Sequence, residues 1–106
     1  MSGSRIITED DELLDNVHPG DILREDFLIG SEIPLQEVSV GAGIDPDRLA
    51  ALVASKIAVD ADIDLRLGRY FGMSEGFFLR LQNSYDLEEV RRAQGVELAK
   101  IIRRAA

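Results

Sequence analysis

The sequence contains no cysteine among its 106 residues. This absence excludes disulfide bonds, thiolate metal ligands and cysteine nucleophiles together. The chain also has only one histidine, His18, and a single histidine without cysteine is a poor basis for a metal site. We therefore expect no metal or other cofactor, and we expect His18 to help begin a helix.

Long apolar runs are also missing, since no stretch approaches the ~20 apolar residues that a transmembrane helix needs. The first residues, MSGSRIITEDDELL, lack the basic and then apolar pattern of a signal peptide. We therefore expect a cytoplasmic protein with no membrane partner. No catalytic serine–histidine–aspartate set, phosphate-binding glycine loop or dinucleotide fingerprint is present, so we do not expect an enzyme.

Basic residues are scarce in the first half of the chain. Residues 1–47 hold twelve acidic and two basic residues, whereas residues 48–106 hold eight acidic and ten basic residues. The overall net charge is −8. A basic partner would suit the acidic half and a phosphate partner the other half, although a solvated acidic surface explains the charge equally well. We expect residues 1–17 to form a flexible acidic arm and residues 18–106 to form one domain.

Helical spacing and helix-ending residues recur from His18 onward, and no segment alternates with the period of a strand. Helices are expected from Pro19 to Gly30, from Pro34 to Gly43, from Asp45 into Val53, and from Asp60 to Gly72. A fifth helix should begin at Ser74 and continue to Tyr85. Asp86 followed by Glu89 resembles a capping box, which predicts a sixth helix beginning there, with Gly95 as a weak point. The fold class is therefore expected to be all-α.

Residues 35–52, LQEVSVGAGIDPDRLAAL, match the requirements of a helix-turn-helix. Ser39 is small enough for the point where two helices touch, and Gly43 can adopt the left-handed turn conformation four residues later. Ile44 follows the turn as an apolar residue, and Leu49 and Leu52 lie on one face of the second helix. An ordinary helical hairpin would show the same pattern.

Three separated segments resemble motifs of the HigA-type antitoxins, which are also described as virulence-associated protein I-like regulators or plasmid-maintenance antidote proteins. Residues 18–28, HPGDILREDFL, are similar to HPGEILREEFL of that family; residues 65–72, LRLGRYFG, and residues 77–87, FFLRLQNSYDL, also match. The similarity runs without gaps from Val17 to Val90. The resemblance implies a lambda-repressor-like helix-turn-helix domain, with five core helices and a C-terminal helix. It also implies a homodimeric repressor that binds operator DNA and neutralises an mRNA-cleaving toxin.

The departures from this family fall where DNA contact is expected. Leu35 stands where the family usually has a glutamine, and Ala54–Ser55 stands where it has Asn-Gly. The second helix of the motif begins Asp-Pro-Asp-Arg and carries alanines on its outer face. Alanine can contact a thymine methyl group but cannot form hydrogen bonds with a base edge.

Six residues are the candidates for DNA contact: Asp47, Arg48, Ala51, Lys56, Arg66 and Arg69. Structural roles compete with this interpretation, because Arg48 can pair with an upstream aspartate and Arg66 and Arg69 with Asp62 or Asp64. The leading hypothesis is a DNA-binding repressor and antitoxin that acts as a dimer through its C-terminal helix, with double-stranded operator DNA and a cognate toxin as partners. The alternative is a protein-binding module that kept the scaffold and lost sequence-specific DNA binding.

Overall fold

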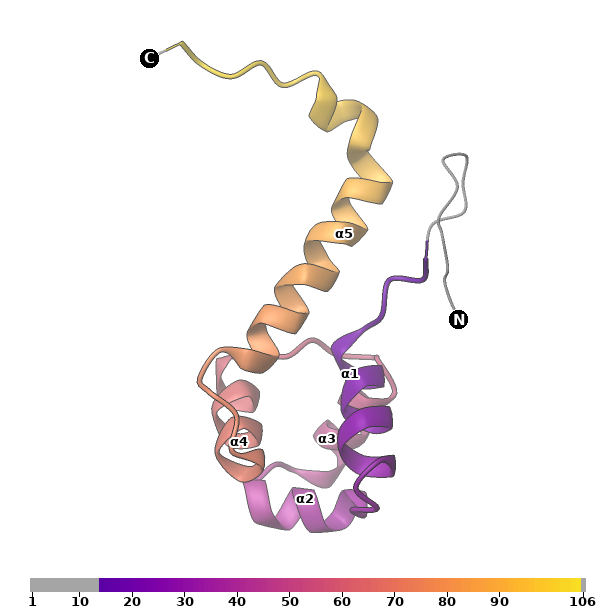
Figure 1. Cartoon of the computed structure of the whole chain (residues 1–106), viewed down its shortest axis with the longest axis vertical. Helices are drawn as coiled ribbons and strands as arrows, with labels where there is room; N and C mark the ends of the chain where they lie inside the picture. Colours follow the sequence, from indigo (N-terminus) through magenta and orange to yellow (C-terminus); the bar gives the residue numbers. More distant parts are fainter. Residues whose placement is uncertain (1–13, 106) are drawn as a thin grey trace.

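The computed structural model describes residues 14–105, which form an all-helical body with one long projecting helix (Figure 1). The elements are α1 (Pro19–Ile22), the π-helix η1 (Leu23–Ile29), α2 (Leu35–Ala42), α3 (Pro46–Val53), α4 (Ala61–Phe71) and α5 (Phe77–Ala99). The all-α prediction is confirmed. The predicted sixth helix is absent from this part of the chain, because α5 runs through the position where it was expected to begin.

The first predicted helix is present but changes its winding part-way along. His18 begins α1 as expected, because its Nδ1 accepts a hydrogen bond from the backbone N–H of Gly20 at 2.9 Å. From Leu23 to Ile29 the chain continues as a π-helix, which the sequence pattern did not predict. The edge of the His18 ring also contacts Tyr85 of α5, with 4.9 Å between ring centroids. The only histidine therefore joins the start of α1 to α5.

The core lies where η1, α2, α3, α4 and the start of α5 converge. Its buried apolar residues are Leu23, Leu28, Val38, Ala42, Ile44, Leu49, Leu52, Val59, Ile63, Leu67 and Phe78. Burial of each larger side chain contributes about 1.5–3 kcal/mol. Phe27 of η1 packs against Phe71, Phe77 and Phe78, with ring centroids 5.0 to 6.3 Å apart. This packing joins η1 to the end of α4 and the start of α5.

Two predictions about α5 are wrong: its start at Ser74, and a capping box at Asp86 and Glu89. The helix begins at Phe77 rather than Ser74, after Gly76 in the left-handed conformation. The Asp86–Glu89 pair forms no capping box, since Asp86 lies inside α5 and accepts a hydrogen bond from Gln82 Nε2 at 2.9 Å. A local break does occur at Gln94, beside the glycine expected to be weak.

The described part of the expected N-terminal arm follows α5. Asn16 donates hydrogen bonds to the backbone oxygen of Tyr85 and to Glu89 Oε2, at 2.9 and 3.1 Å. Arg92 donates to the backbone oxygen of Leu14 at 2.6 Å. Residues 1–13 of the expected arm lie outside the described residues.

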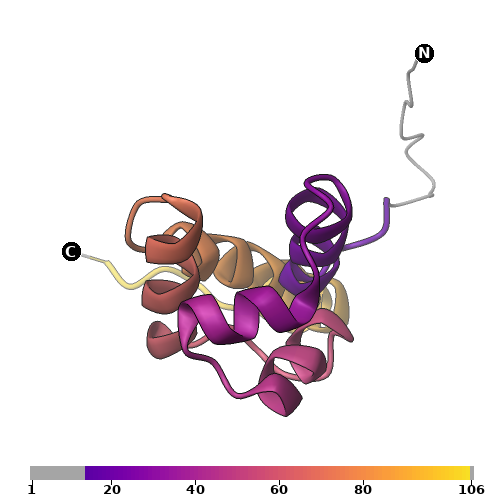
Figure 2. The same cartoon turned by 90° about the horizontal axis from the view of Figure 1, so that it is seen from below.

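The two helices of the predicted motif lie together on the body. Seen from below, α2 crosses the face of the body between η1 and α4, with α3 beside it (Figure 2). In Figure 1, α2 is at the opposite end of the molecule from the C-terminal half of α5. This arrangement separates the surface expected to bind DNA from the C-terminal half of α5.

Candidate nucleic-acid interface

The turn between α2 and α3 has the geometry that the sequence predicted. Gly43 is left-handed, with φ +69°, and its backbone N–H donates to the oxygen of Ser39. The Ser39 hydroxyl is buried and donates to the backbone oxygen of Ile44 at 2.6 Å. Leu49 and Leu52 are each only 1% exposed. The small residue, the glycine and the apolar residues therefore hold two short helices in a helix-turn-helix arrangement.

The start of α3 carries negative charge at the end that would approach DNA phosphates. Asp45 is the N-cap, because its carboxylate accepts hydrogen bonds from the backbone N–H groups of Asp47 and Arg48 at 3.0 and 3.2 Å. Asp47 follows in the first turn with an exposed side chain. These carboxylates interact favourably with the positive end of the helix dipole, but they would repel the phosphates of DNA.

The outer face of α3 offers little for reading base edges. Ala50 and Ala54 are exposed and Ala51 is half-buried. Their methyl groups can only make apolar contacts, such as with a thymine methyl. Hydrogen-bonding capacity on α3 therefore rests with Asp47 and Arg48.

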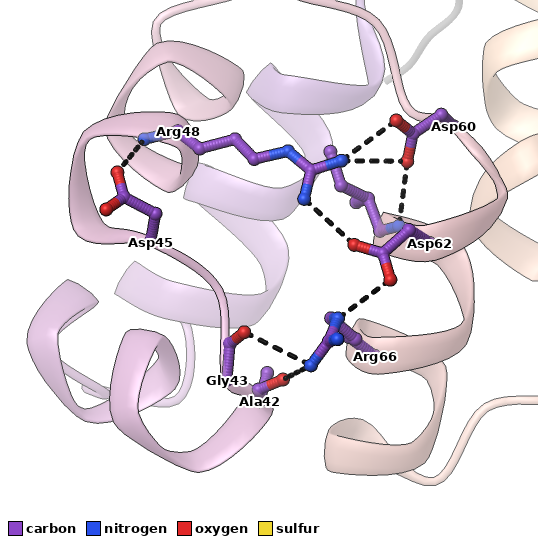
Figure 3. Close-up of polar contacts among 8 residues, drawn as sticks. Ala42, Gly43, Asp45, Arg48, Asp60, Asp62 and Arg66 are labelled. Atoms are coloured by element: carbon purple, nitrogen blue, oxygen red, sulfur yellow. Dashed lines mark hydrogen bonds and ion pairs between the residues drawn. The ribbon is translucent and has the colours of Figure 1, made fainter.

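The Arg48 side chain extends from α3 to the beginning of α4 (Figure 3). Its guanidinium nitrogens lie 2.8 Å from Asp60 Oδ2 and 2.9 Å from Asp62 Oδ2. The prediction that Arg48 pairs with an upstream aspartate is wrong. Both carboxylates that pair with its side chain, Asp60 and Asp62, come later in the sequence. The hydrogen bond to Asp62 is the main cause that raises the pKa of Arg48. Arg48 is therefore held on the protein by two acidic residues.

Arg66 of α4 is bound to the same carboxylate. Its Nε lies 2.9 Å from Asp62 Oδ1, an i, i+4 pair that agrees with one of the predicted partners. Its Nη1 donates to the backbone oxygens of Gly43 and Ala42 at 3.2 and 3.4 Å. Arg66 thus connects α4 to the turn of the motif.

The other two basic candidates do not share the Asp62 carboxylate. Arg69 Nη2 is 3.5 Å from Glu75 Oε2, so its partner is neither Asp62 nor Asp64 as predicted. Lys56 follows the opposite end of α3 from Arg48, and its side chain is exposed. Within residues 14–105 it has no ion-pair partner. The structure thus joins Arg48 and Arg66 through one carboxylate, whereas Arg69 pairs with Glu75 and Lys56 lies beyond the other end of α3.

Asp64 has a structural role that the sequence reasoning missed. It is 1% exposed, and its carboxylate accepts hydrogen bonds from the backbone N–H groups of Gly76, Phe78 and Leu79 at 2.7, 2.8 and 3.0 Å. The signal was present, because Asp64 lies between Ile63 and Leu67 on the inner face of its helix.

No group of three potential metal-ligating side chains is arranged around a common point in residues 14–105. None of the described helices is both long and apolar enough to cross a membrane.

Comparison with known proteins identifies the family of this helix-turn-helix body. No family model matches the chain. Virulence-associated protein I of Dichelobacter nodosus is 35% identical over 72 residues, which cover 68% of this chain and 67% of that protein. Pseudomonas aeruginosa antitoxin HigA, solved with the higBA promoter, has a TM-score of 0.77 and 29% identity, and the match covers 87% of this chain and all of that one. The chain belongs to the HigA-type antitoxin family.

A second Pseudomonas aeruginosa structure, of a protein with its operator DNA, gives a TM-score of 0.79 and 30% identity over 86% of this chain and all of that one. These two solved relatives are an antitoxin and an operator-binding protein, which agrees with the expected non-enzymatic function. The resemblance identified from the three sequence motifs is confirmed.

One departure from the usual HigA-type sequence has a clear backbone consequence. Ser55, at the position where the family usually has a glycine, adopts φ +62°. The left-handed conformation favours glycine, so Ser55 holds a backbone conformation that a glycine would adopt without steric penalty. The Ser55 hydroxyl donates to Asp21 Oδ1 at 3.1 Å, a contact that helps to hold it.

Proposed function

We propose that the protein is a DNA-binding transcriptional repressor of its own operon and the antitoxin of a toxin–antitoxin pair, whose toxin cleaves mRNA. The observation that carries the proposal is the helix-turn-helix of α2 and α3, in a fold that matches the full length of two chains solved with promoter or operator DNA. Such a motif places its second helix in the major groove.

The proposed contacts follow from side-chain chemistry. Arg48, Lys56, Arg66 and Arg69 would contact phosphates, and such contacts position the protein without reading sequence. Ala51 would contact a thymine methyl group, and Asp47 would accept a hydrogen bond from the N4 amino group of cytosine. With so few base contacts, the shape and flexibility of the DNA would supply part of the specificity.

The proposed repressor is a homodimer formed through the C-terminal part of the chain. Val96, Ile101 and Ile102 have 74%, 72% and 89% of their surfaces exposed, and α5 carries this region away from the body (Figure 1). An apolar stripe of this kind needs cover, which a second copy would provide. Two recognition helices about 34–36 Å apart would then reach successive major grooves. We expect light scattering to give a dimeric mass, and a monomeric mass would contradict this arrangement.

The test of repressor function is fluorescence anisotropy of the purified protein with its own upstream DNA, compared with a scrambled duplex of equal length. We expect preference for the upstream DNA and weaker binding as salt rises. Lys56→Ala should reduce the slope of log K against log salt by roughly one per protomer. Arg91→Ala, an equal charge change in the middle of α5 and outside the proposed dimer contact, is the control. Equal binding of both duplexes would contradict sequence-specific repression.

A second candidate function is a protein-binding module, and a hollow beside the motif favours it. The hollow has a volume of about 430 Å³ and an apolar lining that includes Ile29, Ile33, Leu35 and Val53. The lining also includes Arg24 and Glu32. Every lining residue except Val53 comes from residues 14–47, a segment with eight acidic residues and one basic residue. An amphipathic basic segment of a partner protein would match both properties.

This second function is tested with the protein encoded next to this chain, by co-purification with wild type and with Ile29→Glu. Loss of a basic partner on Ile29→Glu would support docking in the hollow. Val40→Glu is the control, because Val40 is also exposed but does not line the hollow. Equal effects of the two substitutions would contradict this site.

A further inference from the structure

Two arginines and two aspartates form a continuous cluster where α3 meets α4 (Figure 3). Arg48 pairs with Asp60 and Asp62 at 2.8 and 2.9 Å, and Arg66 pairs with Asp62 at 2.9 Å. Asp62 is the shared member, since Oδ2 faces Arg48 and Oδ1 faces Arg66. One carboxylate thus engages two of the four basic residues proposed to contact phosphate.

The two aspartates of this cluster differ in what else they do. Asp60 is the N-cap of α4 and accepts a hydrogen bond from the backbone N–H of Ile63 at 2.9 Å. Asp62 lies in the first helical turn, and its recorded hydrogen bonds within residues 14–105 come only from the two arginines. Asp62 can therefore be changed without removing a helix cap.

The ion pairs of Asp62 are exposed enough to be exchanged for others. The side chains of Arg48, Arg66 and Asp62 are 35%, 46% and 49% exposed. Exposed pairs of this kind contribute little to stability, so an incoming phosphate can compete for the same guanidinium groups. To do so it must displace the Asp62 carboxylate and also approach its negative charge.

We propose that Asp62 is an affinity-determining residue that weakens the binding of phosphate backbones by holding Arg48 and Arg66 on the protein. This inference rests on the proposed function, because it concerns the same surface. Asp62 acts through the two arginines and does not itself touch DNA. It sets how many positive charges the motif presents to a duplex.

The test is Asp62→Asn, which keeps the shape of the side chain and removes its charge. We expect the affinity for a duplex at low salt to rise about three- to tenfold. The slope of log K against log salt should become steeper by roughly one per protomer, because Arg66 loses its carboxylate partner while Arg48 keeps Asp60 alone. Anisotropy is measured with both the upstream DNA and a scrambled duplex, and a thermal melt checks that the variant is folded.

Two further variants separate the release of arginines from a general change of charge. Asp26→Asn makes the same chemical change at an exposed carboxylate of η1 that forms no ion pair with either arginine, so it should raise affinity less and leave the salt slope nearly unchanged. In the double variants Asp62→Asn/Arg48→Ala and Asp62→Asn/Arg66→Ala, part of the gain should be lost. Equal effects of Asp62→Asn and Asp26→Asn, or a gain that persists without the arginines, would overturn the proposal.

The two duplexes distinguish this inference from the proposed function. If Asp62→Asn binds both duplexes more tightly but equally, the inference holds and sequence-specific repression fails. If the wild-type protein prefers its upstream DNA and Asp62→Asn changes nothing, repression holds and the inference fails. If Asp62→Asn binds neither duplex at low salt, the inference also fails, because releasing the arginines has created no affinity for phosphate.

Discussion

The buried carboxylate of Asp64 accepts a hydrogen bond from the backbone N–H of Phe78 at 2.8 Å, and this contact joins α4 to the start of α5. The same carboxylate accepts from Gly76 and Leu79. A side chain from another helix thus performs the capping that normally comes from the residue preceding a helix.

Replacement of Asp64 should destabilise the fold strongly. Asp64→Ala leaves three backbone donors at the start of α5 without their acceptor, and we expect a loss of about 2–4 kcal/mol in the free energy of unfolding. Urea denaturation at fixed protein concentration measures this change. Asp47→Ala removes an exposed carboxylate and is the control, with an expected change within about 0.5 kcal/mol. Similar losses in both variants would contradict the capping role.

Gly41 of α2 lies directly against the ring of Tyr70 of α4. A Cβ atom at this position would lie 2.2 Å from Tyr70 Cε1, so Gly41→Ala must displace the ring. We expect a loss of about 1–3 kcal/mol, although alanine usually favours a helix over glycine. Gly95→Ala is the matched control, because a Cβ there meets nothing within 4 Å, and it should stabilise the protein by up to about 1 kcal/mol.

The cause assigned to the Gly41 effect can be checked in a second background. Gly41→Ala should cost much less when Tyr70 is also replaced by alanine, since the clashing ring is then absent. Thermal or urea unfolding of the four variants in this cycle gives the coupling between the two positions. A cost that is unchanged without the ring would disprove the steric explanation.

Because of the left-handed backbone of Ser55, we expect Ser55→Gly and Ser55→Ala to differ in stability. Both Ser55→Gly and Ser55→Ala remove the hydrogen bond to Asp21, but only glycine adopts φ +62° without a steric penalty. We therefore expect the glycine variant to be more stable than the alanine variant by about 1–2 kcal/mol. Equal midpoints of urea unfolding would show that this turn relaxes in solution.

We expect the free energy of unfolding to depend on pH through Glu88. Hydrogen bonds from Arg92 and Arg91 lower the pKa of Glu88 in the folded protein. A lowered folded-state pKa gives stability that is present above the unfolded pKa and is lost as the pH falls through the folded pKa. We expect Glu88→Gln to flatten the loss of stability between about pH 5 and pH 3, the usual range for carboxylates.

The control for this pH dependence lies on the same helix. Glu97→Gln makes an equal change of charge where the nearest cation, Lys100 Nζ, is 3.5 Å away. Unfolding curves recorded at several pH values should show a smaller effect of Glu97→Gln than of Glu88→Gln. Parallel curves for wild type and Glu88→Gln would contradict a role for this carboxylate.

The sequence by itself determined the elements that depend on neighbouring residues. Gly43 in the left-handed turn and the caps Asp45 and Asp60 form hydrogen bonds within a few residues, so their geometry follows from local sequence. The burial of Leu49 and Leu52 followed from their spacing on one helical face. These local rules predicted the two helices, the turn between them and their inward faces, a pattern that an ordinary helical hairpin shares.

Only the tertiary structure decided how residues from different helices meet. Asp62 and Asp64 are two positions apart, yet Asp62 holds exposed arginines whereas Asp64 is buried at the start of α5. The partners of Arg48 are 12 and 14 residues away, and their choice depends on how α3 packs against α4. The continuity of α5 through Asp86 was likewise undetermined by sequence, because a residue that can cap a helix also fits within one when its side chain finds another partner. Local hydrogen bonds are set by sequence separation, whereas contacts between helices exist only once the core has fixed their relative positions.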